Sequence, residues 1–327
     1  MLVDFEACRL PGPSDPTQLP RACGRRRGYG PRAAAGAGRG ELCDKPAGEG
    51  LTVVRSHFLR TGIFLSLGVL VLASCGDSAR PREGSHRPDF ECPAYAVEGL
   101  EVSCLTSRGA TYTVLRVDLR AARIKVLWQN PAGVPYGSLD QAHRQLGGDL
   151  LALMNAGIYS ESHTPEGLHV EEGVTLSPLN LNGGEGNFYW RPNGVFYVAD
   201  DGAGVVASEK FNSLSGRSGV REATQSGPLL VIDGEVNPAL KPDSQSLYVR
   251  NGVGVKSPDE VYFVISEAEV NLYDFASVFK EQLRCRDALY LDGCVSQAYL
   301  PARGVHLPLR RQCNKELVGL LGVLKRR

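Results

Sequence analysis

The 327-residue sequence lacks several features that mark common functional classes. No apolar run reaches the roughly 18 to 20 residues of a membrane-spanning helix, which excludes a polytopic membrane protein. Lys plus Arg and Asp plus Glu balance at 36 each, so the chain has no broadly basic character for nucleic acid. The absence of any Cys-x-x-Cys pair leaves a zinc knuckle or thioredoxin-type site without support, and no Gly-x-Ser-x-Gly elbow indicates a serine hydrolase.

The first 74 residues have the composition of a leader rather than of a fold. Residues 1–50 hold nine Gly and six Pro and show no helical or strand period, which predicts an over-extension of the reading frame or a disordered leader. Residues 51–74 resemble a lipoprotein signal peptide, with two arginines, then 14 uncharged residues, then small residues before Cys75. We expect Cys75 to be lipidated and residues 75–90 to form a tether; a short spanning anchor is the alternative.

This leader predicts a protein of the cell envelope, anchored by its N-terminal lipid and facing the periplasm or the exterior. Removing the leader's ten basic and six acidic residues leaves a mildly acidic chain without a polybasic patch, so no nucleic-acid partner is expected. Export makes disulfides plausible. Cys92 and Cys104 would close a short loop, and Cys313 could pair with Cys285 or Cys294.

Residues 91–327 are predicted to form a single α+β domain, with a largely antiparallel or mixed β-sheet, many hairpins and one or two packed helices. Alternation of apolar and polar residues predicts a hairpin between 111–118 and 124–128. Residues 150–154 form a short buried run. The Asn193-Gly194 and Asp233-Gly234 pairs supply the left-handed positions of tight hairpin turns.

Two helices are expected. Residues 138–146 have apolar side chains on one face, and 271–283 carry a longer apolar stripe that Asn271 can cap. The second helix lies between the predicted strands 261–266 and 288–291. This strand–helix–strand spacing predicts that the two strands are parallel within one sheet.

Three charged residues stand directly at predicted strand ends. Asp292 follows a buried strand and precedes a glycine, a usual position for a catalytic carboxylate, although Asp-Gly is also simply a turn. Glu267 follows a neighbouring strand, and two carboxylates at adjacent strand ends suit acid/base chemistry at a glycosidic bond; the alternative is two exposed loop acids. Arg250, followed by glycines that leave room for a ligand, could bind phosphate or be a surface residue.

A metal site has little support. His163, Glu166 and His169 are close in sequence, but the surrounding glycines suggest a hairpin that points the two histidines to opposite faces. We therefore expect neither a metal nor another cofactor.

Six segments, taken in order, resemble the motif set of the phosphodiester glycosidase family. The resemblance covers about 110–305. The six segments are MNAGIY (154–159), PEGLHVEEG (165–173), NFYWRPNGVFYV (187–198), ATQSGPLLVIDG (223–234), RNGVGV (250–255) and LYLDGCVSQAYLP (289–301). The resemblance implies that Asp292 lies in the active site and that further residues line the same pocket: Asn155, Gln225, Gly227, Arg250 and Ser296. Glu267 is assigned from its strand position alone.

The resemblance implies hydrolysis of the glycosidic bond of a sugar-1-phosphodiester, of the N-acetylglucosamine type or derived from an envelope polysaccharide. Arg250 would stabilise the departing phosphate, Asp292 would activate water or shield the oxocarbenium ion, and Glu267 would assist. The sequence departs from the family where Cys294 and Val295 replace two glycines. The alternative hypothesis is therefore a non-catalytic lipoprotein that binds glycan or envelope polymer in the same pocket.

Overall fold

The computed structural model describes residues 90–213, 219–293, 295–309, 313 and 315–326. All of them fall within one compact unit, Ala79–Arg327. The predicted leader, signal peptide and lipidation site at Cys75 lie outside the described residues. No helix in the described part is long and apolar enough to cross a membrane.

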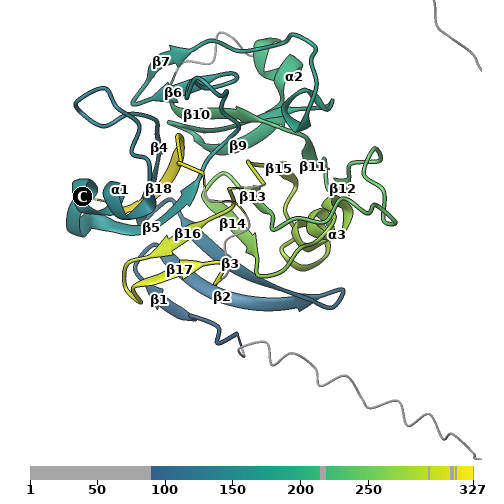
Figure 1. Ribbon diagram of the computed structural model, residues 1–327, viewed down its shortest axis with the longest axis horizontal. Coiled ribbons are helices and arrows are strands. Elements are labelled where there is room, and N and C mark those ends of the chain that lie inside the picture. The colour runs from purple at the N-terminus through teal and green to yellow at the C-terminus, as the bar shows by residue number, and fades with distance from the viewer. Residues whose placement is uncertain (1–89, 214–218, 294, 310–312, 314, 327) are drawn as a thin grey trace, which may run out of the picture. The chain divides into compact units, whose positions relative to one another are not determined.

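The largest sheet has eight strands, and every neighbouring pair in it is antiparallel. Figure 1 shows it in the lower and right parts of the molecule. Its strands in spatial order are β1 (Tyr95–Val97), β2 (Leu100–Ser107), β3 (Ala110–Asp118), β14 (Glu260–Ser266), β13 (Asn251–Ser257), β15 (Asp287–Tyr290), β11 (Leu229–Ile232) and β12 (Glu235–Val236).

Two further antiparallel sheets have five strands each. The second sheet runs β7 (Val174–Ser177), β6 (His169–Glu171), β10 (Val220–Ser226), β8 (Gly194–Ala199) and β9 (Gly202–Ala207). The third runs β17 (Val305–Leu307), β16 (Ala298–Leu300), β5 (Leu150–Asn155), β18 (Leu320–Lys325) and β4 (Ala122–Leu127). The antiparallel character expected from the sequence is confirmed, but the described residues form a mostly-β fold with three sheets.

The predicted hairpin between 111–118 and 124–128 is wrong. Both strands exist as β3 and β4, but β3 pairs with β2 and β14, whereas β4 pairs with β18 in the third sheet. After Asp118, the amide of Leu119 donates a hydrogen bond to the carbonyl oxygen of Asp259 (2.9 Å). The chain therefore stays beside the start of β14 before it passes to β4 in the third sheet. Alternation predicts a strand with one buried face but says nothing about its partner.

The two predicted turn dipeptides behave differently. Asp233 (φ 48°) and Gly234 (φ 84°) are left-handed and join β11 to β12, as expected for a tight hairpin. Asn193 and Gly194 form no such turn, since β8 begins at Gly194 and the Asn193 side chain donates to the Phe188 carbonyl oxygen at 2.9 Å. The turn prediction at Asn193 is therefore wrong.

The helices are short. The predicted helix at 138–146 is confirmed as α1 (Leu139–Leu146), which Ser138 caps at the amide of Gln141. The second forms as α3 (Leu272–Ser277), capped by Asn271 at the amide of Asp274 and continued by the π-helical η3 (Val278–Gln282). The remaining helical segments are η1 (Gly147–Asp149), η2 (Asn187–Tyr189) and α2 (Ser208–Ser213).

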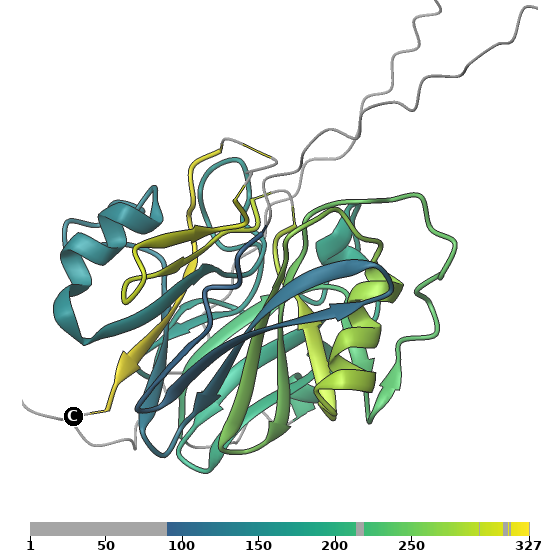
Figure 2. The same cartoon turned by 90° about the horizontal axis from the view of Figure 1, so that it is seen from below.

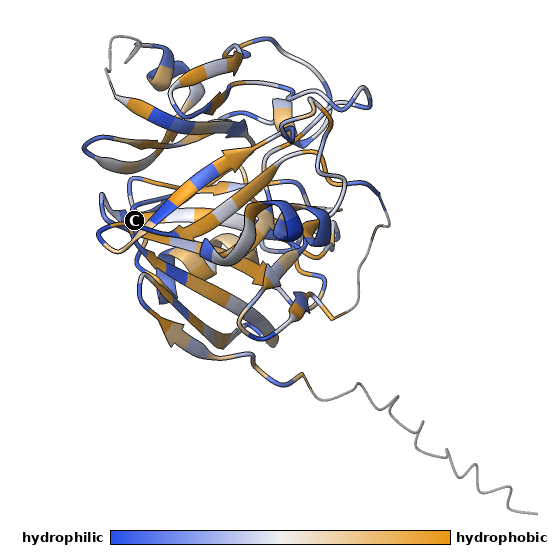
Figure 3. Ribbon diagram, turned by 90° about the vertical axis from the view of Figure 1, so that its left-hand side faces the viewer, coloured by the Kyte–Doolittle hydropathy of each residue, from blue (hydrophilic) through white to orange (hydrophobic). Residues whose placement is uncertain are grey.

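The main core lies between the eight-stranded sheet and the other two sheets. Along β14, alternate residues such as Phe263 and Ile265 enter this core, while Tyr262 and Val264 face α3 on the opposite side. The strand is therefore apolar on both faces. Figure 3, coloured by hydropathy, shows hydrophobic residues along many of the strands. Figure 2 shows α3 packed beside the large sheet.

The glycines of β13 make room for this helix and not for a ligand, so that part of the prediction is wrong. A Cβ atom at Gly254 would lie 2.5 Å from the Phe279 ring, and one at Gly252 would lie 3.0 Å from Phe275. Because both rings are fully buried, neither has space to withdraw.

Three strands of the large sheet explain how the site is placed. β13 pairs antiparallel with both β14 and β15, so β14 and β15 are parallel and their carboxyl ends face the same edge. This confirms the predicted crossover, with the difference that β13 lies between the two strands. Glu267 and Asp292 therefore follow two strands that end on the same side of the sheet. The axes of these two strands are about 10 Å apart, because β13 lies between them.

The predicted Cys92–Cys104 disulfide is confirmed and ties the segment before β1 to β2. Cys313 is disulfide-bonded. Cys285 is a free, buried thiol and so is not its partner, while Cys294 lies outside the described residues.

Candidate active site

A pocket of about 470 Å³ opens where β5 and β15 end and β18 begins. Segments that are distant in sequence converge there, all of them at strand ends or in the loops that follow. Its lining residues are Asn155, Gly157, Tyr159, Ser160, Glu161, His163, Asp292, Val295 and Lys315–Gly319. Asp292 and Asn155 are the predicted site residues that line it.

Asp292 is the carboxylate set most deeply into the pocket wall. Burial raises its pKa to about 6, because removal from water disfavours the charged form, and the positive charge of Lys315 opposes this shift. Lys315 is exposed at the same pocket. The pocket therefore combines a desolvated carboxyl group with a solvated cation, and the carboxyl group is mostly ionised at pH 7.

A buried polar network holds the backbone at Asp292. The Asn155 Nδ2 donates to the carbonyl oxygen of Asp292 at 3.0 Å. Asn251 donates to the Asn155 Oδ1 at 3.0 Å and accepts from the Ser296 hydroxyl at 3.0 Å. All three side chains are at most 3% exposed. Asn155 and Ser296, both predicted to bind substrate, thus act chiefly by positioning Asp292.

Arg250 is fully buried behind the pocket. Its guanidinium donates to the Val270 carbonyl oxygen (3.1 Å), the Tyr290 hydroxyl (2.8 Å) and the Ser246 carbonyl oxygen (2.7 Å). It also lies 5.0 and 5.2 Å from the ring centres of Tyr248 and Tyr290. Among the described side chains, no carboxylate forms an ion pair with it, so neutral oxygens and aromatic faces stabilise this cation.

Tyr290 lies between Arg250 and the loop that carries Asp292, and it contacts both. A Cβ atom at Gly293 would lie 1.5 Å from the Tyr290 hydroxyl oxygen, so this position admits no side chain. Arg250 Nη1 lies just beyond, 3.6 Å from the same point. The structure therefore places Arg250 as a support for the Asp292 loop and does not bring it to the pocket lining.

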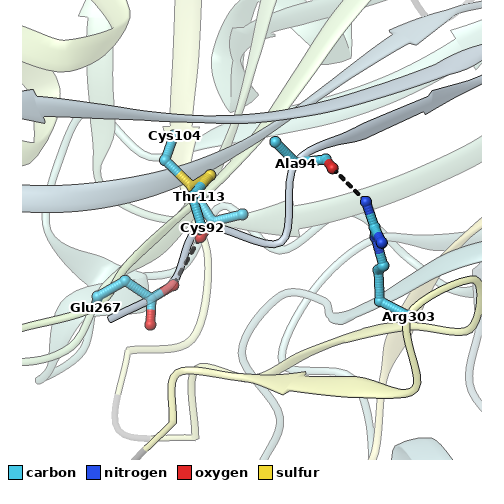
Figure 4. Close-up of a disulfide and its surroundings, with 6 residues drawn as sticks. All are labelled: Cys92, Ala94, Cys104, Thr113, Glu267 and Arg303. Atoms are coloured by element: carbon cyan, nitrogen blue, oxygen red, sulfur yellow. Dashed lines mark hydrogen bonds between the residues drawn. A yellow bond between two sulfur atoms is a disulfide. The ribbon is translucent and has the colours of Figure 1, made fainter. Parts of the chain in front are cut away.

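Glu267 lies at the same edge of the large sheet but does not line the pocket. Figure 4 shows its carboxylate accepting from the Thr113 hydroxyl, at 2.7 Å, beside the Cys92–Cys104 disulfide. Burial raises its pKa, and hydrogen bonds from Thr113 and from the Leu309 amide partly offset that effect. The structure thus does not bring Glu267 and Asp292 into one cavity.

Gln225 and Gly227 organise a neighbouring loop. The Gln225 Oε1 accepts from the amides of Leu168 and Asn180, both at 2.9 Å, and its Nε2 donates to the Asn180 carbonyl oxygen at 2.7 Å. A Cβ atom at Gly227 would lie 2.7 Å from the Asn193 Cβ. The Gln225 amide is therefore committed to protein groups, and neither residue lines the pocket.

Sequence reasoning missed Lys315, Asn251 and Tyr159 as contributors to the site. Lys315 lies beyond the last of the six motifs, where the sequence carries no signal. Asn251 and Tyr159 belong to the RNGVGV and MNAGIY motifs. For Asn251 the available sign was a polar residue at the start of an apolar strand, whereas Tyr159 lies in the loop after β5.

The histidines singled out from the sequence do not form a metal site. His163 lines the pocket, whereas His169 is fully buried in β6. Within the described ranges, no group of three His, Cys, Asp or Glu side chains is placed to hold a metal ion.

Comparison with known proteins identifies the family. The family model described as phosphodiester glycosidase matches residues 149–317, which include Asp292, its supporting network and all the pocket-lining residues except Val318 and Gly319. The chain belongs to this family. An uncharacterized protein of Escherichia coli (strain K12), YigE, is 37% identical over 221 residues, which span 67% of this chain and 85% of YigE.

A solved structure supports the fold. It is the catalytic domain of zebrafish N-acetylglucosamine-1-phosphodiester alpha-N-acetylglucosaminidase, auto-inhibited by its pro-peptide, with a TM-score of 0.50 and 16% identity. The match covers 70% of this phosphodiester glycosidase family member and 83% of the zebrafish chain.

Proposed function

We propose that this phosphodiester glycosidase family member hydrolyses the bond between a sugar and a phosphodiester, with an N-acetylglucosamine-type or envelope-derived sugar as substrate. The observation that carries the proposal is the desolvated Asp292 carboxyl group in the wall of a pocket that also contains Lys315. Membership of the family and the activity of the zebrafish relative named above support this substrate class.

The proposed roles follow from the charges. The phosphate leaving group is already an anion of low basicity, so its departure needs a cation more than a proton. Lys315 supplies that cation at the pocket, and Arg250 supports the loop from behind. Ionised Asp292 activates water or stabilises the developing oxocarbenium ion. The nearby Asn155, Asn251 and Ser296 hold it in place.

A substrate panel tests the proposal. The purified protein is incubated with UDP-N-acetylglucosamine and related sugar-1-phosphodiesters, and the free sugar is measured. We expect release from at least one phosphodiester and none from the matching O-methyl glycoside, which has a poor leaving group. No release across a broad panel, together with measurable glycan binding, would replace the proposal by a non-catalytic glycan-binding lipoprotein.

The pH dependence of kcat/KM should report Asp292. Because its raised pKa is about 6 and the ionised form acts, we expect kcat/KM to be flat above pH 7. Below pH 6 it should fall about tenfold per pH unit. The phosphodiester itself stays ionised throughout this range, so the acid limb belongs to the protein.

A lysine variant tests whether Asp292 causes the fall of kcat/KM at low pH, the acid limb of the profile. Lys315→Met removes the charge that opposes the raised pKa of Asp292, so the limb should move to higher pH. Lys325→Met, at the far end of β18, is the matched control and should leave the limb in place. A limb that Lys315→Met leaves unchanged would show that another group controls it.

We also propose that the protein is an envelope lipoprotein, lipidated at Cys75. The Cys92–Cys104 disulfide and the bonded Cys313 support an oxidising compartment. In cells fed an alkyne-tagged fatty acid, the wild-type protein should be labelled and membrane-associated, and Cys75→Ala should lose both properties. The matched variant Cys285→Ala should keep them, and a labelled Cys75→Ala protein would exclude this site.

A further inference from the structure

A buried chain of polar side chains ends at the pocket wall and has no role in the proposed mechanism. It begins at Tyr159, whose ring lines the pocket and lies against the backbone of Gly319. A Cβ atom at Gly319 would be 2.1 Å from the Tyr159 hydroxyl oxygen, so the glycine allows close contact with the ring. One side of the ring is therefore covered, and the side toward the cavity remains available to a ligand.

The Tyr159 hydroxyl points into the protein. It lies 3.1 Å from the Nδ1 of His169, and burial, with a smaller contribution from Glu171, raises its pKa well above the usual value. The phenol therefore stays protonated at neutral pH and is hydrogen-bonded to His169. This excludes Tyr159 as an ionised nucleophile and leaves its ring as the functional surface.

His169 and Glu171 complete the chain. His169 is fully buried, and its Nε2 lies 2.7 Å from the Glu171 Oε1. A carboxylate can only accept, so Nε2 donates to Glu171, which leaves Nδ1 for the Tyr159 hydroxyl. The same Glu171 oxygen accepts from the Trp128 amide at 2.7 Å, which anchors the chain to the backbone.

This arrangement is more than is needed to fill the interior. An apolar residue at position 169 would fill the space without the cost of burying an imidazole. The order Trp128 amide, Glu171, His169, Tyr159 instead determines the angle of one aromatic ring at the pocket. Binding pockets combine such aromatic walls with a few polar groups, and supporting hydrogen bonds keep them in position.

We propose that the Tyr159 ring is the wall against which the sugar ring of the substrate packs, and that His169 is a positioning residue, held by Glu171, for that wall. The inference rests on the proposed function, because it assigns the glycosyl half of the ligand to this side of the pocket. It adds a binding surface that the assigned roles of Asp292 and Lys315 do not include.

The test measures ligand binding separately from turnover. Trp128 and Trp190 are the two tryptophans of the chain, and Trp128 packs against His169 with 6.0 Å between ring centres. In a Trp190→Phe background, quenching of Trp128 by N-acetylglucosamine-1-phosphate gives a dissociation constant. We expect Tyr159→Leu to weaken binding about tenfold, the loss of a good aromatic contact.

Variants of the chain test the positioning role. Tyr159→Phe and His169→Leu should each weaken binding severalfold, and the double variant should be no weaker than His169→Leu, because the two single variants break the same Tyr159–His169 hydrogen bond. His169→Gln, whose amide can still accept and donate, should restore most of the affinity. On a substrate, these variants should raise KM more than they lower kcat.

The matched control is Tyr189→Phe, which removes a tyrosine–carboxylate hydrogen bond to Glu166 (2.5 Å) outside the pocket lining. It should leave the dissociation constant unchanged. If the enzyme turns over but the Tyr159 and His169 variants bind as tightly as wild type, the inference is wrong and the proposed function stands. If wild type neither binds the sugar phosphate nor releases sugar, both are wrong.

Discussion

Asp292→Asn should reduce sugar release from a sugar-1-phosphodiester by about 10³-fold, because it removes the ionised group while keeping the side chain's size. The supporting hydrogen bond from Asn155 is made to the backbone carbonyl oxygen of Asp292, which the variant keeps. The loss should therefore be in kcat, with KM little changed.

The same variant should be more stable than wild type at neutral pH. Burial raises the pKa of Asp292 from 3.8 to about 6, so the native state binds this proton more tightly than the unfolded state does. The resulting stability is present below pH 3.8 and is lost as the pH rises to 6. Asn removes the penalty, worth about 2 to 3 kcal/mol above pH 6, so the melting temperature should rise at pH 7.

Asp287→Asn is the control for the turnover measurement. Asp287 begins the same strand, β15, and burial raises its pKa too, but it lies at the opposite end and does not line the pocket. Turnover by Asp287→Asn should match wild type. An Asp292→Asn protein that is folded and fully active would remove Asp292 from the mechanism.

Arg250→Met should have the largest effect on folding, a loss of about 3 to 5 kcal/mol of unfolding free energy. The variant leaves the oxygens of Val270, Ser246 and Tyr290 without their donor, and each buried polar group without a partner is costly. Urea unfolding at pH 7 measures the change. Arg250→Lys should lose less but should still lower kcat, because an ammonium group cannot reach all three acceptors.

The control is Arg221→Met. Arg221 pairs with Asp200 at 2.9 Å, but both side chains are more than half exposed, at 61% and 62%. Such a pair contributes about 0 to 1 kcal/mol. Equal urea midpoints for Arg250→Met and wild type would show that the buried guanidinium does not stabilise the fold.

The sequence predicted local structure well and strand partnership poorly. The α1 and α3 helices follow from apolar spacing and from the capping residues Ser138 and Asn271, which act within one turn. The separation of β3 from β4 depends on β18, about 200 residues away along the chain. No pattern within either strand contains that information.

In the candidate site, too, local features could be predicted from the sequence and long-range contacts could not. Asp292 could be predicted because a strand end followed by glycine is a local feature. Lys315 and the polar network around Asn251 could not, because they depend on how three sheets bring strand ends together. Arg250 illustrates a third case, since its residue type suggested phosphate binding while its surroundings commit it to protein oxygens.

The position of β18 has a consequence for how the protein matures. This strand, near the C-terminal end of the described chain, lies between β5 and β4, and residues 315–319 immediately before it line the pocket. A chain emerging N-terminus first from a ribosome therefore lacks both the middle of its third sheet and part of the pocket until residues 315–325 have been released. Contacts of such long sequence separation form slowly. Competence for ligand binding should consequently appear only once β18 has paired with β5 and β4.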